Sequence, residues 1–265
     1  DVFNYTVSDG NGGTDTATIT ITILGINDAP VAQDDEGVIL EGSTLTVANS
    51  ANANVSGSYD ATGEHSGDVI DTSSSSHTDS DADASASLSI THVRLSGGSN
   101  STVASSSSYN SNGTSITGTY GTLTIGADGS YTYAATTDAT NALDSGESAT
   151  DTFVYTLSDG TAITTANLTI TVLGSNDAPV AQNDVGVIAE DSTLTVSDGA
   201  DANETGGSYN ATGEHSGDVI DSSNTSTRDT DVDVETLTVT AIRLGSSEGS
   251  GTAGTVGSAL TGTYG

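Results

Sequence analysis

TFVYTLSDG, residues 152–160, and NLTITVL, residues 167–173, decide the fold of this chain. In both stretches apolar residues alternate with threonine or another polar residue, which is the pattern of a β-strand with one buried face. The Asp-Gly pair at the end of the first stretch favours a hairpin turn. Together the two stretches predict a pair of antiparallel strands.

The same alternation recurs along the chain. Each stretch is short, rich in Thr, Val and Ile, and bounded by Gly, Asp, Asn or Ser, as half-buried strands are. No amphipathic helix is evident, so the sequence predicts an all-β fold. The further predicted strands are residues 16–24, 44–47, 122–125, 193–196 and 236–244.

Three segments of the sequence occur twice, about 150 residues apart, which is the mark of a repeat architecture. NDAPVAQ occupies residues 27–33 and 176–182, and each copy holds one of the two prolines at the same place. GSYDATGEHSGDVID, residues 57–71, returns at residues 207–221 with one change. DVFNYTVSDG at the start of the chain matches the stretch beginning at residue 151.

These repeats predict three units. Residues 1–26 are the C-terminal part of a preceding repeat, and residues 27–175 are a complete β-sandwich repeat with a Ser/Asn/Gly-rich insert near residues 48–78. Residues 176–265 are the N-terminal part of the next repeat, without the portion that matches residues 122–150. Either a longer polypeptide or a neighbouring chain is expected to supply that portion.

The charge of the chain restricts its partners. The sequence has 36 acidic residues against three arginines and no lysine, for a net charge of -33. Such a chain repels nucleic acid and anionic membrane surfaces, so neither nucleic-acid binding nor membrane insertion is expected. It has no cysteine, which excludes disulfides and thiolate metal sites. An oxygen-rich ligand set indicates a hard cation, Ca²⁺.

The strongest candidate ligands are alternating aspartates just before a predicted strand. Carboxylates at every second position can converge on one calcium ion, because calcium takes six to eight oxygens in irregular geometry. A solvated acidic turn is the alternative, and recurrence favours ligation. The two sets are Asp79, Asp81 and Asp83 in DSDAD and Asp229, Asp231 and Asp233 in DTDVD.

A second group of candidates surrounds the prolines. An Asn-Asp pair at a junction can share an ion with acids of the adjoining unit, although Asn and Asp also favour simple Asx-turns. Both interpretations stay open. The residues are Asn27, Asp28, Asp34, Asp35 and Glu41 at the first junction, and Asn176, Asp177, Asp184 and Glu190 at the second.

One constellation resembles an active site or transition-metal site. Glu64, His65, Asp68 and Asp71 recur at residues 214, 215, 218 and 221. Each copy has a single histidine and no nucleophile with a base at fixed spacing, so the chain is not expected to be an enzyme. The valine and isoleucine of GDVID are expected to anchor this loop.

The order of motifs resembles the VCBS-type repeat, one of the cadherin-like and immunoglobulin-like tandem domains of large bacterial surface and secreted proteins. The resemblance rests on NDAPVAQ, EGSTLTV, the spaced aspartates, TGTYGTLTIGADGSYTY and TITVLGSNDAP in sequence order. It implies an elongated array of tandem Ig-like or cadherin-like β-sandwiches, held rigid by calcium at Asn27, Asp28, Asp79, Asp81, Asp83 and their copies. The insert carrying GEHSGDVID departs from the pattern.

The resemblance also implies a role. It predicts a rigid extender in an adhesin or surface filament outside the bacterial cell, active in adhesion or biofilm. Neighbouring repeats or further copies of the chain are the expected partners, and cell-surface or matrix glycans are a further class. The alternative is a set of accessory repeats in a secreted carbohydrate-binding or carbohydrate-degrading protein. The absence of tryptophan, and with it of a strong aromatic platform for sugars, disfavours that alternative.

Overall fold

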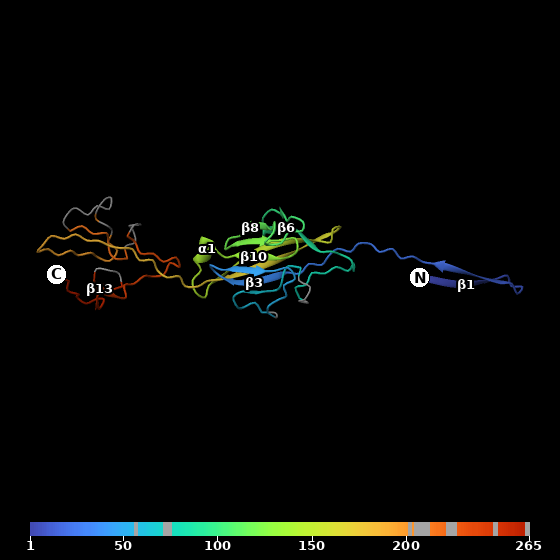
Figure 1. Ribbon diagram of the computed structural model, residues 1–265, viewed down its shortest axis with the longest axis horizontal. Coiled ribbons are helices and arrows are strands. Elements are labelled where there is room, and N and C mark those ends of the chain that lie inside the picture. The colour runs from blue at the N-terminus through green and yellow to red at the C-terminus, as the bar shows by residue number, and fades with distance from the viewer. Residues whose placement is uncertain are drawn as a thin grey trace.

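The computed structural model describes residues 1–55, 58–70, 76–200, 203, 213–220, 227–245 and 249–262. These residues form an elongated particle, with the hairpin of β1 at one end, a β-sandwich in the middle and the strand β13 toward the other end (Figure 1). In the described part of the chain, no helix is long and apolar enough to cross a membrane.

The N-terminal hairpin joins β1 (Val2–Ser8) and β2 (Thr14–Thr20) in antiparallel register. Its turn is closed by Asp9, whose Oδ1 accepts the N–H groups of Asn11 at 2.8 Å and Gly13 at 2.9 Å. These two bonds lower the pKa of the Asp9 carboxyl, because they stabilise its charged form. The pair Asp9-Gly10 therefore lies in a hairpin turn, the structure that the sequence predicts for the corresponding pair Asp159-Gly160.

The sandwich has a six-stranded and a four-stranded sheet. The larger runs in the order β5 (Glu64–His65), β3 (Asp35–Leu40), β12 (Ile163–Leu173), β11 (Ser148–Ser158), β6 (Ser89–Leu95) and β7 (Ser101–Thr102). The smaller runs β4 (Thr44–Val47), β10 (Tyr131–Ala134), β9 (Thr122–Ile125) and β8 (Thr114–Thr117). One short helix, α1 (Asp138–Asn141), follows β10. Neighbouring strands are antiparallel except β3 and β12, which are parallel.

The core lies between the two sheets, and the alternation of the strands decides which side chains fill it. Phe153, Tyr155 and Leu157 of β11 are buried hydrophobic residues of the core, whereas Val154 between the first two is only half-buried. They pack in one cluster with Leu168 and Ile170 of β12 and with residues of the smaller sheet. The all-β sandwich predicted from the alternation is confirmed.

A buried carboxylate fixes the loop that follows β8. Asp151 accepts the N–H groups of Thr119 at 2.9 Å, Tyr120 at 3.0 Å and Gly121 at 3.2 Å, and the hydroxyl of Tyr133 at 2.7 Å. Because Asp151 lies on β11 and Tyr133 on β10, the carboxylate ties the two sheets together.

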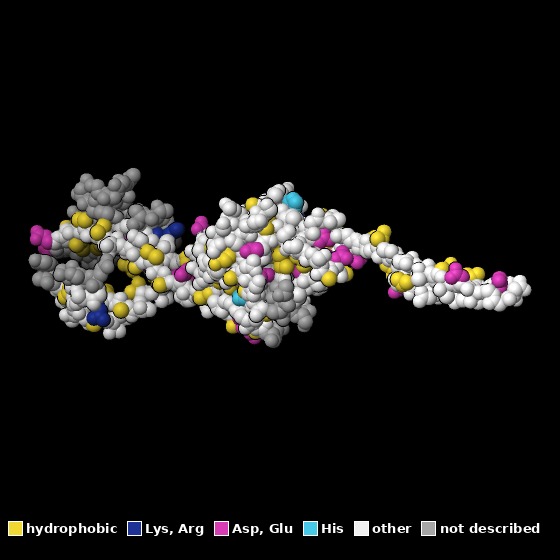
Figure 2. All heavy atoms as spheres, turned by 45° about the vertical axis from the view of Figure 1, so that its right-hand side comes forward, with side chains coloured by type: hydrophobic (Ala, Val, Ile, Leu, Met, Phe, Trp, Pro, Cys, Tyr) yellow, Lys and Arg dark blue, Asp and Glu magenta, His cyan; other side chains and the backbone are white. Residues whose placement is uncertain are grey.

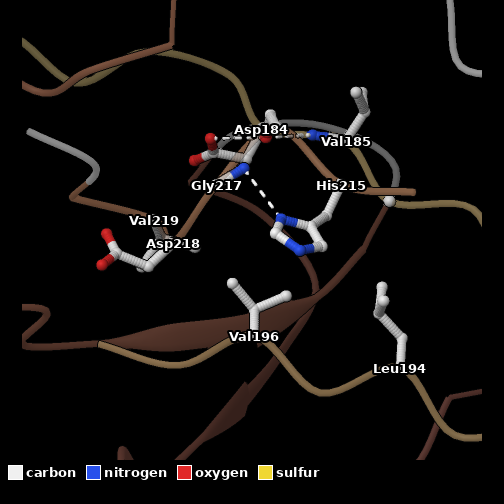
Figure 3. Close-up of a pocket in the computed structure, with 10 residues that line it drawn as sticks. Asp184, Val185, Leu194, Val196, His215, Gly217, Asp218 and Val219 are labelled. Atoms are coloured by element: carbon white, nitrogen blue, oxygen red, sulfur yellow. Dashed lines mark hydrogen bonds between the residues drawn. The ribbon is translucent and has the colours of Figure 1, made fainter. Parts of the chain in front are cut away.

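Residues 176–262 contain fewer strands than the sequence predicts. The described residues of this segment include only β13 (Ile242–Leu244) and β14 (Thr252–Gly254), and residues 193–196 and 236–241 are irregular. The counterpart of residues 193–196 is β4, which is held by pairing with β10. No described strand pairs with residues 193–196, so the alternating pattern there has no partner. Leu194 and Val196 instead line an open cavity of about 380 Å³ (Figure 3).

Candidate cation sites at the unit junctions

The alternating aspartates of DSDAD point in different directions. Asp79 turns inward, where its Oδ1 accepts the N–H of Gln33 at 2.7 Å. Asp83 turns toward the linker, and its Oδ2 accepts the N–H of Asp28 at 2.9 Å. Asp81 Oδ1 accepts the N–H of Asp83 at 2.7 Å. Among the described residues, Asp79, Asp81 and Asp83 do not form a three-carboxylate group of metal-site dimensions.

The first junction site comprises Asn27, Asp28, Asp81, Asp83 and Asp159. Asn27 Nδ2 donates to Asp159 Oδ2 at 2.9 Å, which joins the linker to the turn between β11 and β12. Asp81 Oδ2 is buried and accepts no hydrogen bond from the described chain. Asn27, Asp83 and Asp159 line a cavity of about 430 Å³ beside the linker. Acidic side chains gather on the visible face where the sandwich meets the N-terminal hairpin (Figure 2).

Asp159 has two roles at this site. Its Oδ1 accepts the N–H groups of Thr161 at 2.6 Å and Ala162 at 2.7 Å, as expected of the hairpin turn. The bond to Ala162, with those from Asn27 and Thr161, lowers the pKa of the Asp159 carboxyl, so this group is charged over a wide pH range. The sequence motif Ser-Asp-Gly predicts the turn, but the approach of the linker to the turn is a tertiary contact.

The second junction site brings together acids from the sandwich and from the segment that follows it. It comprises Asp144, Asp177, Asp233 and Glu235, and Asp233 Oδ2 accepts the N–H of Asp177 at 2.6 Å. Carboxylate oxygens of Asp144, Asp233 and Glu235 lie within 4.8 Å of one another, the one such group of three in the described chain. Asp144 precedes β11 of the sandwich, whereas the other three residues follow β12, in the segment predicted to begin the next unit.

Electrostatic repulsion is evident within the second junction site. Desolvation, followed by repulsion from Asp231 and Asp144, raises the pKa of the Glu235 carboxyl above its usual value. In addition, Asp233 Oδ1 is buried and accepts no hydrogen bond from the described residues. A cation bound here would offset the repulsion between the carboxylates and would provide a partner for Asp233 Oδ1. Sequence reasoning missed Asp144 and Glu235, because neither is part of a repeated acidic motif.

Glu41 lies at the exit of the complete unit. It is 8% exposed, and its Oε1 accepts the N–H of Ser175 at 2.5 Å and the Ser175 hydroxyl at 2.6 Å. Its Oε2 is buried and accepts no hydrogen bond within the described chain. Glu41, Asp81 and Asp233 therefore share one property: each has a desolvated oxygen without a donor, which a hard cation could occupy.

Asp35 and Asp79 are buried in the sandwich. Asp35 Oδ2 is 3.0 Å from the Tyr155 hydroxyl, and Asp35 Oδ1 accepts the Ser66 hydroxyl at 3.0 Å. Burial raises the pKa of Asp79 to about 7. Burial, with repulsion from Asp79 and Asp68, raises the pKa of Asp35 well above its usual value. The oxygens of these two predicted ligands are therefore engaged by hydrogen-bond donors in the buried interior.

Most of the remaining predicted ligands form hydrogen bonds with other parts of the described chain. Asp34 Oδ1 accepts the backbone and side-chain N–H groups of Asn167 at 2.8 and 3.1 Å. Asp184 accepts the Ser216 hydroxyl at 2.9 Å, Asp229 accepts the Gln182 N–H at 2.7 Å, and Asp231 accepts the Asp233 N–H at 3.0 Å. Asn176 Nδ2 donates to the carbonyl of Asp177, and Glu190 is exposed.

The acids of the insert hold the backbone in place. Glu64 Oε2 accepts the N–H groups of Asp60 and Ala61, both at 2.7 Å. Asp68 accepts the N–H groups of Ser50 and, at 2.8 Å, Ile70. Asp71 and its counterpart at residue 221 lie outside the described residues. A structural role therefore accounts for the described acids of this constellation.

An all-β sandwich with carboxylates concentrated at the linkers on both of its ends defines a cadherin-like module. Residues 27–174, more than half of the chain, match the family described as bacterial cadherin-like domain, and the chain belongs to that family. Domains of this family are typically structural rather than enzymatic, and they occur in surface proteins. Neither the curated proteins nor the solved structures contain a match to the chain.

Proposed function

We propose that the chain is a calcium-stabilised extender of a surface adhesin or filament outside the bacterial cell, built from tandem VCBS-type repeats. Calcium at the two junction sites would fix the angle between consecutive units. The immediate partners are then the neighbouring units of the array. The particle contributes to adhesion or biofilm by its length, which holds other parts of the adhesin or filament away from the cell.

One observation carries this proposal. At the second junction site, carboxylates from two units approach within 4.8 Å, and Asp233 Oδ1 has no donor among the described residues. Like charges at this separation repel each other, and a buried acceptor without a partner costs about 1–3 kcal/mol. A calcium ion would reverse both effects, because it attracts all the carboxylates and completes the coordination of the desolvated oxygen.

The first junction site supports the same conclusion. Asp81 Oδ2 lacks a donor from the described chain, and Asp83 and Asp159 hold the linker residues Asp28 and Asn27. An ion bound to these oxygens would connect the linker to the unit that follows it. Extracellular calcium modules bind with dissociation constants of about 10⁻⁴ to 10⁻³ M, so millimolar calcium would fill such sites.

Thermal unfolding of the whole chain in calcium and in chelator, together with small-angle scattering, tests the proposal. At a calcium concentration of about ten times the dissociation constant, binding stabilises the folded state by about 1.4 kcal/mol per site. We expect a higher melting temperature and a longer, narrower distance distribution in calcium, with magnesium less effective. Unchanged melting and unchanged scattering in the two conditions would refute the proposal.

A further inference from the structure

Strand β3 lies between two strands although it comes first in its unit. On one edge it pairs in parallel with β12 over six positions, from Leu168 opposite Asp35 to Leu173 opposite Leu40. On the other edge it pairs in antiparallel fashion with β5, which is part of the insert. The insert therefore converts β3 from an edge strand into an internal strand.

Ser66 provides the tightest connection between the insert and β3. Its N–H donates to the carbonyl of Glu36 at 2.9 Å, and its Oγ accepts the N–H of Glu36 at 3.0 Å. The same Oγ lies 3.0 Å from Asp35 Oδ1. Ser66 is 0% exposed, so these bonds are protected from water. One residue before β5, the N–H of Gly63 donates to the carbonyl of Val38 at 2.7 Å.

The insert is itself anchored in the sandwich. Val69 is fully buried in the core, and its N–H donates to the carbonyl of Gly129 at 3.1 Å. Asn54 braces β5 from its outer side, because its Oδ1 accepts the N–H of His65 at 2.6 Å and its Nδ2 donates to the carbonyl of Gly63 at 2.8 Å. The valine anchor expected from the GDVID motif is present in this unit.

The same contacts recur in the next unit. Ser216 donates to the carbonyl of Val185 at 3.0 Å, its Oγ accepts the N–H of Val185 at 3.1 Å, and it donates to Asp184 Oδ1 at 2.9 Å. Figure 3 shows Asp184 and Val185 beside the segment that carries His215, Gly217 and Asp218. No described strand pairs with the other edge of residues 184–189, so the contact forms without help from a counterpart of β12.

The topology determines how tension would load β3. The N-terminal linker precedes β3 and the C-terminal linker follows β12, and the two linkers leave the sandwich at opposite ends (Figure 1). Because the two strands are parallel, pulling on the linkers slides β3 along β12 and strains all their hydrogen bonds together. The bonds between β3 and the insert must break in the same movement.

We propose that residues 63–70 are a mechanical latch, which holds β3 in the sandwich when the chain is pulled along its long axis. The latch covers the edge of β3 that β12 leaves open. From that edge it resists the separation of β3 from the sheet. Its use in the cell rests on the proposed extender role, but none of its hydrogen bonds requires an ion. The two proposals can therefore fail separately.

Single-molecule pulling on the full chain, held by its two ends, tests the latch. Unfolding of the complete unit is recognised by the contour length released by residues 27–175. The variant is Ser66→Ala and its matched control is Ser130→Ala. Ser130 is also 0% exposed, accepts one N–H, from Tyr109 at 3.0 Å, and donates to a carboxylate, that of Asp128, but it lies at the turn before β10.

We expect both serine variants to lower the denaturant midpoint, and only Ser66→Ala to raise the unfolding rate at constant force, by about tenfold. Asn54→Ala, at an exposed site, gives a second readout if Ser66→Ala does not fold. Its control is Asn110→Ala, since exposed Asn110 bonds only the Ser108 hydroxyl among the described contacts, at 2.8 Å. Equal forced unfolding rates for each variant and its control would overturn the latch.

The measurements are made in calcium and in chelator. If the latch is correct, the ratio of variant to wild-type unfolding rates is the same in both solutions. If the length and the unfolding of the wild-type chain are the same in calcium and in chelator, the extender mechanism is contradicted. That result does not contradict the latch. A rate increase that appears only in calcium would count against the latch.

Discussion

The hydroxyl of Tyr155 lies 3.0 Å from Asp35 Oδ2, in the interior of the sandwich. The same hydroxyl is 2.7 Å from the carbonyl of Gln33 and 3.3 Å from Asp79 Oδ2. A phenol has one proton to donate, so it cannot satisfy three acceptors at once. Burial raises the pKa values of Asp35 and Asp79, and the hydrogen bonds that these carboxylates accept, including the one from Tyr155, offset only part of that rise.

Replacing Tyr155 by Phe should destabilise the complete unit. The change leaves buried acceptors without their shared donor, which costs roughly 1–3 kcal/mol of unfolding free energy. Urea denaturation followed by circular dichroism measures this loss. Tyr109→Phe, at a half-buried position outside this cluster, is the control and should change stability by less than about 0.5 kcal/mol. Equal midpoints for the two variants would contradict the prediction.

In chelator, the protein should become less stable as the pH rises from 4 to 8. The folded-state pKa of Asp79 is raised from 3.8 to about 7, so the folded state binds a proton that the unfolded state has released. The associated stability is complete below pH 3.8 and is lost as the pH rises through 7. Between these values the slope is at most about 1.4 kcal/mol per pH unit for each proton.

Asp79→Asn should reduce this slope. Asparagine keeps an oxygen for the N–H of Gln33 and supplies a permanent donor toward Tyr155, but it does not titrate. Removing an equal charge at exposed Asp138, by Asp138→Asn, should leave the slope nearly unchanged. The test is the melting temperature of each variant, measured at each pH unit. If the curves of melting temperature against pH for Asp79→Asn and wild type are parallel, other groups cause the pH dependence of stability.

Asp144→Asn should weaken calcium binding at the second junction site by roughly tenfold, or about 1.4 kcal/mol, because it removes the charged ligand that the complete unit contributes. Isothermal calorimetry measures the affinity, and scattering measures the length of the particle. Asp138→Asn, which also removes one negative charge nearby in sequence, should bind calcium like wild type. If both variants lose affinity equally, the effect is one of overall charge.

Asp151→Asn should be among the most damaging single changes. The carboxylate accepts hydrogen bonds from three backbone N–H groups and from Tyr133, and an amide cannot accept all four with one oxygen. Hydrogen bonds to charged groups contribute about 1.5–3 kcal/mol, so we expect a loss in that range or larger. Chemical denaturation of Asp151→Asn, with Asp60→Asn at an exposed site as the control, tests this expectation. A difference in unfolding free energy below about 0.5 kcal/mol between the two variants would contradict it.

Four strands of the complete unit, β4, β9, β11 and β12, were predictable because their sequences are strongly patterned. Residues 152–157 and 167–173 lie within β11 and β12, and residues 44–47 and 122–125 coincide with β4 and β9. The same pattern failed at residues 193–196, because a strand needs a neighbour as well as a pattern. Alternation specifies which face is buried, and pairing specifies whether a strand forms at all.

The candidate sites were only partly predictable. The repeat identified Asp81, Asp83 and Asp233, and the linker motif identified Asn27 and Asp177. Spacing alone could not show that the first aspartate of DSDAD turns into the core toward Tyr155. Asp144 lies near Glu235 only because two segments about 90 residues apart in sequence meet in the fold, so no local pattern in either segment predicts their contact.

Each linker is bonded to the unit that follows it. Asp28 donates to Asp83 at 2.9 Å, and Asp177 donates to Asp233 at 2.6 Å in the corresponding place. A gene duplication that copies a unit therefore copies the joint in front of it as well. Recombination could then add or remove whole units, and the angle between the remaining neighbouring units would stay the same.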